Sequence, residues 1–158
     1  MDALEEAILK SGSAAYIAFG SSQDADMRYL TKFSTTDPIV YIKKPGEQGV
    51  VVVSQMEYER ARRESTAAVM SRSEAGLFEI LKEEKDRWRA LARMVAGLVQ
   101  GAVLVPPHLP YALAKELSAL IPVEIDRTAL VTMRGRKSEE EIGMIRQVQV
   151  AVEEAMQT

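Results

Sequence analysis

The sequence predicts an α/β fold in which a mixed sheet of five to six strands is flanked by helices. Short apolar or β-branched runs alternate along the chain with segments whose apolar residues recur every three or four positions. Two of the β-branched runs are joined by a short turn-rich segment, which favours an antiparallel hairpin and makes the sheet mixed. The 158 residues, 47% of them hydrophobic, are enough for one domain with its own core.

The first third of the chain predicts one helix and three strands. Apolar residues at helical spacing over 4–8 precede Ser11-Gly12, a pair typical of a helix end. The continuous apolar run at 14–19 has the length of a buried strand, and glycine and serines follow it. The β-branched runs 39–42 and 50–53 predict the two strands of the hairpin.

The middle third predicts a helix, a strand, a long helical stretch and another strand, in that order. Residues 56–63 favour a short helix, and residues 67–70 favour a strand. Apolar faces that begin at Leu77 and continue to Val99 indicate a long helical stretch, which Gly101 ends. Residues 102–105 predict a strand that the following prolines stop.

The last third begins with a predicted helix over 111–120, where leucines form one stripe. Extended structure is predicted for 121–126 and again at Leu130-Val131, because both contain β-branched residues without helical periodicity. The chain then changes character and becomes acidic at Ser138.

Ser138 and Glu141 are the two ends of a predicted capping box. The serine hydroxyl can accept from the N–H of the third helical residue, and Glu141 can reach back to the Ser138 N–H. An apolar stripe follows from Ile142 to Met156, and the predicted helix reaches Thr158 without a stop signal. We expect the natural chain to continue, because an amphipathic helix at the end of a domain needs a partner surface to cover.

Composition excludes several classes of function. The net charge of −3 is unsuited to sequence-independent nucleic-acid binding, so we expect no nucleic-acid partner. The chain has no cysteine, which excludes disulfides and thiolate metal sites. We expect no signal peptide and no membrane span, because the N-terminus is acidic and no apolar run approaches the required ~20 residues. The sequence therefore predicts a cytoplasmic protein.

Residues suited to metal or nucleophilic catalysis are sparse. His108 is the single histidine, and a lone histidine in a loop is more often a surface or capping residue than a metal ligand. Asp24 and Asp26 lack the glycine and glutamate of a calcium loop and predict a solvated loop with a cap at Asp26. The turn at 20–22 lacks the lysine of a phosphate loop. A Ser-His-Asp triad assembled from distant positions stays open, although no G-x-S-x-G motif is present.

A basic cluster, Arg134, Arg136 and Lys137, precedes the acidic helix start. It could bind an anion or nucleic acid, but the net negative charge favours a solvated linker.

Two segments carry a resemblance to a known family. The segment Asp26–Phe33 (DMRYLTKF) resembles the N-x-R-Y-L-T-G-F segment of proline-specific metallopeptidases. The segment Met133–Arg146 resembles their R-x-x-K-S-x-x-E-I-x-x-I-R junction between an N-terminal and a catalytic domain. The chain is thus similar, over nearly its whole length, to the N-terminal domain of Xaa-Pro dipeptidase (prolidase), aminopeptidase P and creatinase.

The resemblance implies a division of the chain and a missing partner domain. Residues 1–132 would be the α/β domain, and residues 133–158 would be a linker and the first helix of a catalytic domain. That domain holds two divalent metals (Mn, Co or Zn) through two Asp, one His and two Glu, and a metal-activated water attacks the bond before proline. None of its motifs occurs here, so we expect no catalytic residue, no metal ligand and no cofactor in this chain. The partners implied are that catalytic domain and a second copy in a homodimer.

Two departures from the family pattern matter. Asp26 replaces the usual asparagine, and Lys32 replaces a common glycine, which implies a different or strained local turn. The stretch Ser34–Asp37 corresponds to one that, in some dimeric members, projects toward the neighbouring active site.

The resemblance makes Arg28, Tyr29, Phe33 and Asp37 candidates for the face that controls substrate access or dimerisation. The competing interpretation is that Tyr29 and Phe33 are core residues and that Arg28 is a surface charge. A second hypothesis for the whole chain is a peptidase-like binding module without catalysis, to which the acidic balance would attract basic partners. A third, less favoured, is a small enzyme that uses carboxylates only.

Overall fold

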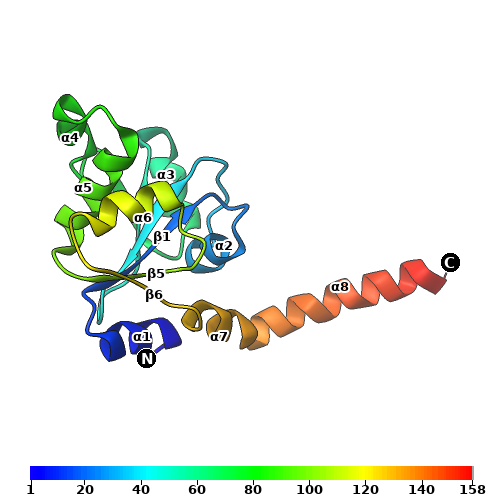
Figure 1. Cartoon of the computed structure of the whole chain (residues 1–158). Helices are drawn as coiled ribbons and strands as arrows, with labels where there is room; N and C mark the ends of the chain where they lie inside the picture. Colours follow the sequence, from blue (N-terminus) through cyan, green and yellow to red (C-terminus); the bar gives the residue numbers. More distant parts are fainter. Residues whose placement is uncertain (158) are drawn as a thin grey trace.

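The computed structural model describes residues 1–157, which form one six-stranded sheet with helices on both faces (Figure 1). The strands are β1 (Ala15–Gly20), β2 (Ile39–Lys43), β3 (Val50–Val53), β4 (Ala68–Ser71), β5 (Val103–Val105) and β6 (Val123–Ile125). The helices are α1 (Ala3–Ser11), α2 (Ala25–Thr31), α3 (Gln55–Glu64), α4 (Leu77–Glu83), α5 (Arg87–Val99), α6 (Tyr111–Ser118), α7 (Ala129–Gly135) and α8 (Glu139–Gln157). The predicted α/β class is confirmed.

The sheet has the order β4-β3-β2-β1-β5-β6 and is mixed, as predicted. β2 pairs antiparallel with both β1 and β3, with Ile17 opposite Ile42 and Tyr41 opposite Val51. The remaining pairs, β1 with β5, β5 with β6 and β3 with β4, are parallel. The carboxyl ends of β1, β5 and β6 therefore lie at one edge, where the loops that follow them can meet.

Each face of the sheet has its own core. Ala15 and Ile17 of β1 pack with α4, α5 and α6, whereas Tyr16 and Ala18 point to the opposite face and pack with α1, α2, α3 and α7. This alternation is what an extended strand covered on both faces requires, and it explains why β1 reads as a continuous apolar run.

The predicted long helical stretch is in fact two helices, α4 and α5. The Asp86 side chain accepts hydrogen bonds from the Trp88 and Arg89 N–H groups, both at 2.9 Å, and so begins a new helix. Glu84 before it is extended. The apolar spacing is nearly continuous across the break and no Gly or Pro marks it, so only the aspartate cap could have indicated it.

The extended structure predicted at Leu130-Val131 is wrong, because both residues belong to helix α7. The Asp126 carboxylate accepts from the Ala129 N–H at 2.9 Å. Leu130 is buried between α7 and the sheet, whereas Val131 is 70% exposed. Burial of one side of a short segment thus outweighs the weak strand preference of valine.

Helix α8 leaves the compact part of the molecule and extends away from it (Figure 1). None of its described residues is buried. Thr158, to which the prediction extended this helix, lies outside the described residues. Within residues 1–157, no helix is both long and apolar enough to span a bilayer.

Candidate functional site

The resemblance-bearing segment 26–33 begins inside helix α2, whose two ends are each fixed by a specific residue. At the start, the Asp24 carboxylate accepts from the N–H groups of Asp26 and Met27, at 2.7 and 3.1 Å. The cap is therefore Asp24, and the prediction of a solvated loop capped by Asp26 is wrong. At the other end, Lys32 has φ of 52° and its N–H donates to the Arg28 carbonyl at 3.0 Å.

The positive φ of Lys32 confirms that a non-glycine residue occupies a left-handed position. We expect Lys32→Gly to be more stable than Lys32→Ala by about 1 kcal/mol, because only alanine retains the steric cost of a Cβ. Both substitutions remove the same side-chain contacts, so their difference isolates the backbone contribution. Urea unfolding of the two variants measures it, and equal midpoints would show that the turn carries no such cost.

Tyr29 of α2 and Lys32, the residue that ends this helix, contact α7 and the start of α8. The Tyr29 hydroxyl donates to the Met133 carbonyl of α7 at 3.3 Å. The Lys32 ammonium lies 4.6 Å from the centre of the Tyr29 ring and 3.7 Å from the Glu141 carboxylate. A groove of about 540 Å³ runs between these elements, and its lining also includes Ser138. We call these contacts among α2, α7 and the first turn of α8 the junction.

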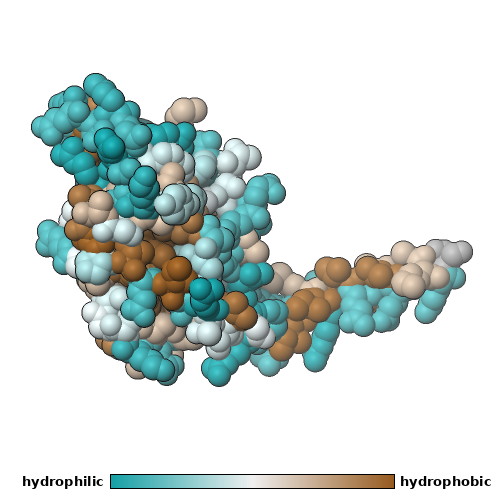
Figure 2. Space-filling model, viewed as in Figure 1, coloured by the Kyte–Doolittle hydropathy of each residue, from teal (hydrophilic) through white to brown (hydrophobic). Residues whose placement is uncertain are grey.

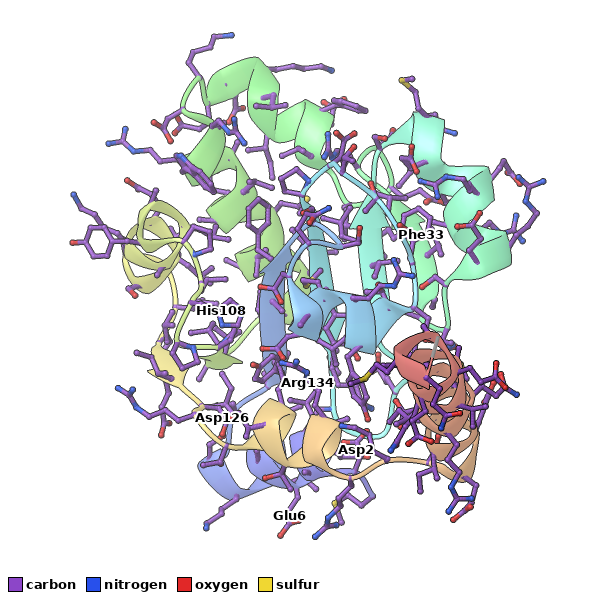
Figure 3. The ribbon with its side chains drawn as sticks, turned by 90° about the vertical axis from the view of Figure 1, so that its right-hand side faces the viewer. Asp2, Glu6, Phe33, His108, Asp126 and Arg134 are labelled. Carbon is purple, nitrogen blue, oxygen red and sulfur yellow. The ribbon has the colours of Figure 1, made fainter. Side chains whose placement is uncertain are left out.

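A cluster of charged side chains fixes the other end of α2. Arg134 of α7 donates to Asp26 at 2.9 Å, and His108 Nε2 lies 2.8 Å from Asp24 and 3.8 Å from Asp26. Figure 3 shows that His108, Arg134 and Asp126 come from different elements and lie in the same region of the molecule. Arg134 therefore lies in the last turn of α7 and forms an ion pair with Asp26 of α2. The prediction that it belongs to a solvated linker is wrong.

Asp24, Asp26 and His108 are also the residues that could hold a metal ion. One ligand atom from each lies within 4.8 Å of the others. Two carboxylates and one imidazole suit ions such as zinc or manganese. However, Asp24 already accepts from two amides at the N-terminus of α2, and Asp26 accepts from Arg134. The positive end of α2 and the guanidinium both oppose a cation here, so the geometry favours an internal ion-pair cluster.

Tyr16 of β1 lies in the core on the sheet face that α2 and α7 cover. Its hydroxyl oxygen is the one fully buried side-chain polar atom of residues 1–157 for which the structure gives no hydrogen-bond partner. Burial raises the pKa of Tyr16 far above its usual value, and the charges of Asp126 and Asp26 raise it further. The phenol therefore stays neutral at every physiological pH.

The structure brings together only some of the candidate residues. Tyr29 reaches the junction, but Phe33 is 1% exposed and lies in the core, where the Arg60 guanidinium is 4.5 Å from its ring centre. Arg28 and Asp37 are exposed, and no described contact joins them to the junction. Lys32 was not among the predicted site residues, although it contacts Tyr29 and Glu141 in the junction. The signal in the sequence was that Lys32 stands where the family commonly has glycine.

The capping box is confirmed, and it ties Glu141 to the junction. The Ser138 N–H donates to Glu141 at 2.8 Å, and the Glu141 N–H donates to the Ser138 hydroxyl at 3.2 Å. The Ser138 N–H and, secondarily, the positive charge of Lys32 lower the pKa of Glu141 below its usual value.

Because folding lowers the pKa of Glu141, the stability that its ionised carboxylate adds to the first turn of α8 is fully present above the ordinary glutamate pKa. It is lost as the pH falls through the folded value. We expect the Ser138 amide resonance to follow this titration, measured by NMR together with the Glu141 carboxyl carbon. Glu141→Gln is the control, since glutamine preserves a capping acceptor but does not titrate. A Ser138 response that persists in the glutamine variant would contradict the assignment.

Comparisons with known proteins find one matching family model and several structures with a similar fold. The sequence model of the Creatinase/Prolidase N-terminal domain matches residues 1–138. The fold is similar to that of the prolidase from Pyrococcus horikoshii OT3, with a TM-score of 0.69, 21% identity and coverage of 98% of this chain and 40% of that chain. It is also similar to an X-Pro aminopeptidase from Thermotoga maritima, with a TM-score of 0.66, 16% identity and coverage of 93% and 42%.

A third similar structure is itself an isolated domain. It is the N-terminal domain of a cytoplasmic peptidase from Mycobacterium tuberculosis, with a TM-score of 0.57, 18% identity and coverage of 83% of this chain and 95% of that one. No curated protein sequence matches the chain significantly. The chain spans about 40% of the length of the prolidase, and at these identities the structural likeness shows the fold alone.

Proposed function

Because the chain belongs to the creatinase/prolidase N-terminal domain family, whose sequence model covers residues 1–138, we propose that it is the non-catalytic N-terminal domain of a Xaa-Pro dipeptidase-like metallopeptidase. The family match is the observation that carries this proposal. In the intact protein the domain would serve dimerisation and control of substrate access. A cytoplasmic location is part of the proposal, and the peptidase from Mycobacterium tuberculosis is described as cytoplasmic.

In the proposed enzyme, the junction would help to position the catalytic domain. Asp26 holds Arg134 of α7, and Lys32 contacts Glu141 in the first turn of α8. One contact joins α2 to α7 and the other joins the residue after α2 to α8, and together they would restrict the direction in which α8 leaves the domain. Residues 133–158 would then form the connection to the catalytic domain, and the junction would set the position of that domain relative to the sheet.

The exposed apolar side of α8 supports the proposal that another protein surface covers this helix. Figure 2 shows apolar residues along one side of α8 and hydrophilic residues along the other. Met144, Ile145, Val148 and Val152 are each at least 50% exposed. An apolar stripe of this kind is stabilised when another surface covers it. We propose that the catalytic domain covers it, with Arg28 and Asp37 left free to face a second subunit.

Two divalent metals, manganese, cobalt or zinc, belong to the proposed catalytic domain. Within residues 1–157, the one group of side chains close enough to share an ion is Asp24, Asp26 and His108. It offers three ligands where the two-metal site uses two Asp, one His and two Glu, and its carboxylates are already hydrogen-bonded. The chain therefore does not fit that centre, and no catalytic step is assigned to its residues.

The test is hydrolysis of Gly-Pro and Ala-Pro in the presence of Mn²⁺, by the 158-residue chain and by the product of the complete reading frame. We expect turnover only from the longer product, and we expect its additional sequence to contain the five ligands. Turnover by the pure 158-residue chain would refute a non-catalytic domain. A longer product without the ligands and without activity would instead favour the binding-module hypothesis, for which the net charge of −3 predicts basic partners.

A further inference from the structure

A cavity of about 300 Å³ lies on the sheet face opposite the junction, between the sheet and helices α4 and α5. Its walls are mainly apolar and come from three strands, two helices and the loops beside them. Val40 and Val52 form its floor on β2 and β3, and Met94 of α5 closes one side. All three are at most 2% exposed, so this wall is part of the folded core and is present before any ligand arrives.

Two arginines, Arg72 and Arg87, line the same cavity, and no acidic residue does. Neither arginine takes part in an ion pair with any residue between 1 and 157. Arg72 donates one hydrogen bond, to the Pro38 carbonyl at 3.3 Å, and so retains further N–H donors. The Arg87 guanidinium lies 5.0 Å from the centre of the Trp88 ring. The Trp88 ring in turn packs edge-on against the Phe19 ring, with 5.7 Å between the two ring centres.

We propose that this cavity binds a small carboxylate with an apolar body. The apolar walls would cover the hydrocarbon part, and the guanidinium groups would donate charge-assisted hydrogen bonds to the carboxylate. A cationic ligand is disfavoured because both charges lining the cavity are positive. Inorganic phosphate is disfavoured because it would leave the apolar walls without a partner and would lose its hydration. The site goes beyond the proposed peptidase role and does not depend on it.

The size of the cavity limits the ligand. A volume of about 300 Å³ is at the lower end of the range for small-molecule sites. Octanoate, a straight-chain carboxylate, suits this volume, and its neutral analogue octanamide has nearly the same shape. For a ligand of about ten non-hydrogen atoms with ordinary efficiency, the expected Kd is on the order of 1 mM.

The experiment is a methyl NMR titration of the 158-residue chain with octanoate and, separately, with octanamide. We expect octanoate to shift the methyl resonances of Val52 and Met94 with saturation, and octanamide to bind about tenfold more weakly. The substitutions Arg72→Met and Arg87→Met should each weaken octanoate binding several-fold to tenfold while leaving octanamide unchanged, because methionine preserves the apolar stem. Arg89→Met, on the same helix but outside the cavity, is the matched control and should leave both affinities unchanged.

Several outcomes would overturn the proposal. One is the absence of saturable shifts at Val52 and Met94 with octanoate at about ten times the expected Kd. Another is equal affinity for the acid and the amide, which would show that the arginines do not recognise the carboxylate. A third is an equal loss of binding in the Arg89 control, which would point to an unspecific effect of surface charge. Two-dimensional spectra of each variant establish that it is folded before it is titrated.

Discussion

Replacement of Phe33 by alanine is expected to lower the free energy of unfolding by about 3–5 kcal/mol. The side chain is 1% exposed and belongs to the core between the sheet and helices α1, α2, α3 and α7. Its removal takes apolar surface out of the core and leaves a cavity that the surrounding strands cannot fill completely. The substitution also removes the ring from the Arg60 guanidinium, 4.5 Å from its centre.

This prediction separates the two interpretations of the segment 26–33. Urea unfolding monitored by circular dichroism gives the free energy for the wild type, Phe33→Ala and Arg28→Ala. Arg28 is exposed, so its substitution should change stability by no more than about 0.5 kcal/mol. A loss below about 1 kcal/mol in Phe33→Ala would contradict a core role and return the residue to the access or interface candidates.

The second large effect is expected at Gly49, where alanine should cost about 2–3 kcal/mol. Tyr41 of β2 lies opposite Val51 of β3, and its ring lies over Gly49, the residue two positions earlier on the same face. A Cβ on Gly49 would be 2.3 Å from the Tyr41 hydroxyl oxygen and 2.6 Å from the ring carbon that bears it. Tyr41 is only 6% exposed, so its ring can move away from an added Cβ only by displacing the side chains packed around it.

A double-mutant cycle tests this cause directly. In a Tyr41→Leu background the ring is absent, and Gly49→Ala should then cost less than about 1 kcal/mol. The matched control is Gly97→Ala in helix α5, where the added Cβ would meet nothing within 4 Å. That change should stabilise the protein by up to about 1 kcal/mol through helix propensity. If Gly49→Ala costs the same with and without the Tyr41 ring, the close contact is not the reason for the glycine.

Several features follow from local sequence alone because their causes are local. The hairpin of β2 and β3 needs only two β-branched runs and a turn-rich connection between them. The start of α8 needs only Ser138 and Glu141, which satisfy each other's backbone N–H groups within one helical turn. Lys32 was marked as an unusual turn residue by the resemblance, because it stands where the family commonly has glycine, and its positive φ is a feature of the structure.

Other features depend on residues that are far apart in the sequence. Arg134 and His108 approach α2 only because β1 and β5 lie side by side and α7 packs against the same sheet face. The helical state of Leu130 reflects which side chains the sheet buries and not the periodicity of a short segment. The cavity that holds Arg72 and Arg87 combines residues from separate strands and helices.

The sequence by itself therefore determined the class of fold, the elements with strong periodicity, the capping box and the family. Those depend on backbone hydrogen bonds and apolar spacing over a few residues. The tertiary structure decided how Tyr29 and Lys32 contact α7 and α8, and where Arg72 and Arg87 meet apolar surface. These depend on distances between residues up to about a hundred positions apart, which chain order does not encode and which only the packing of the elements on the sheet establishes.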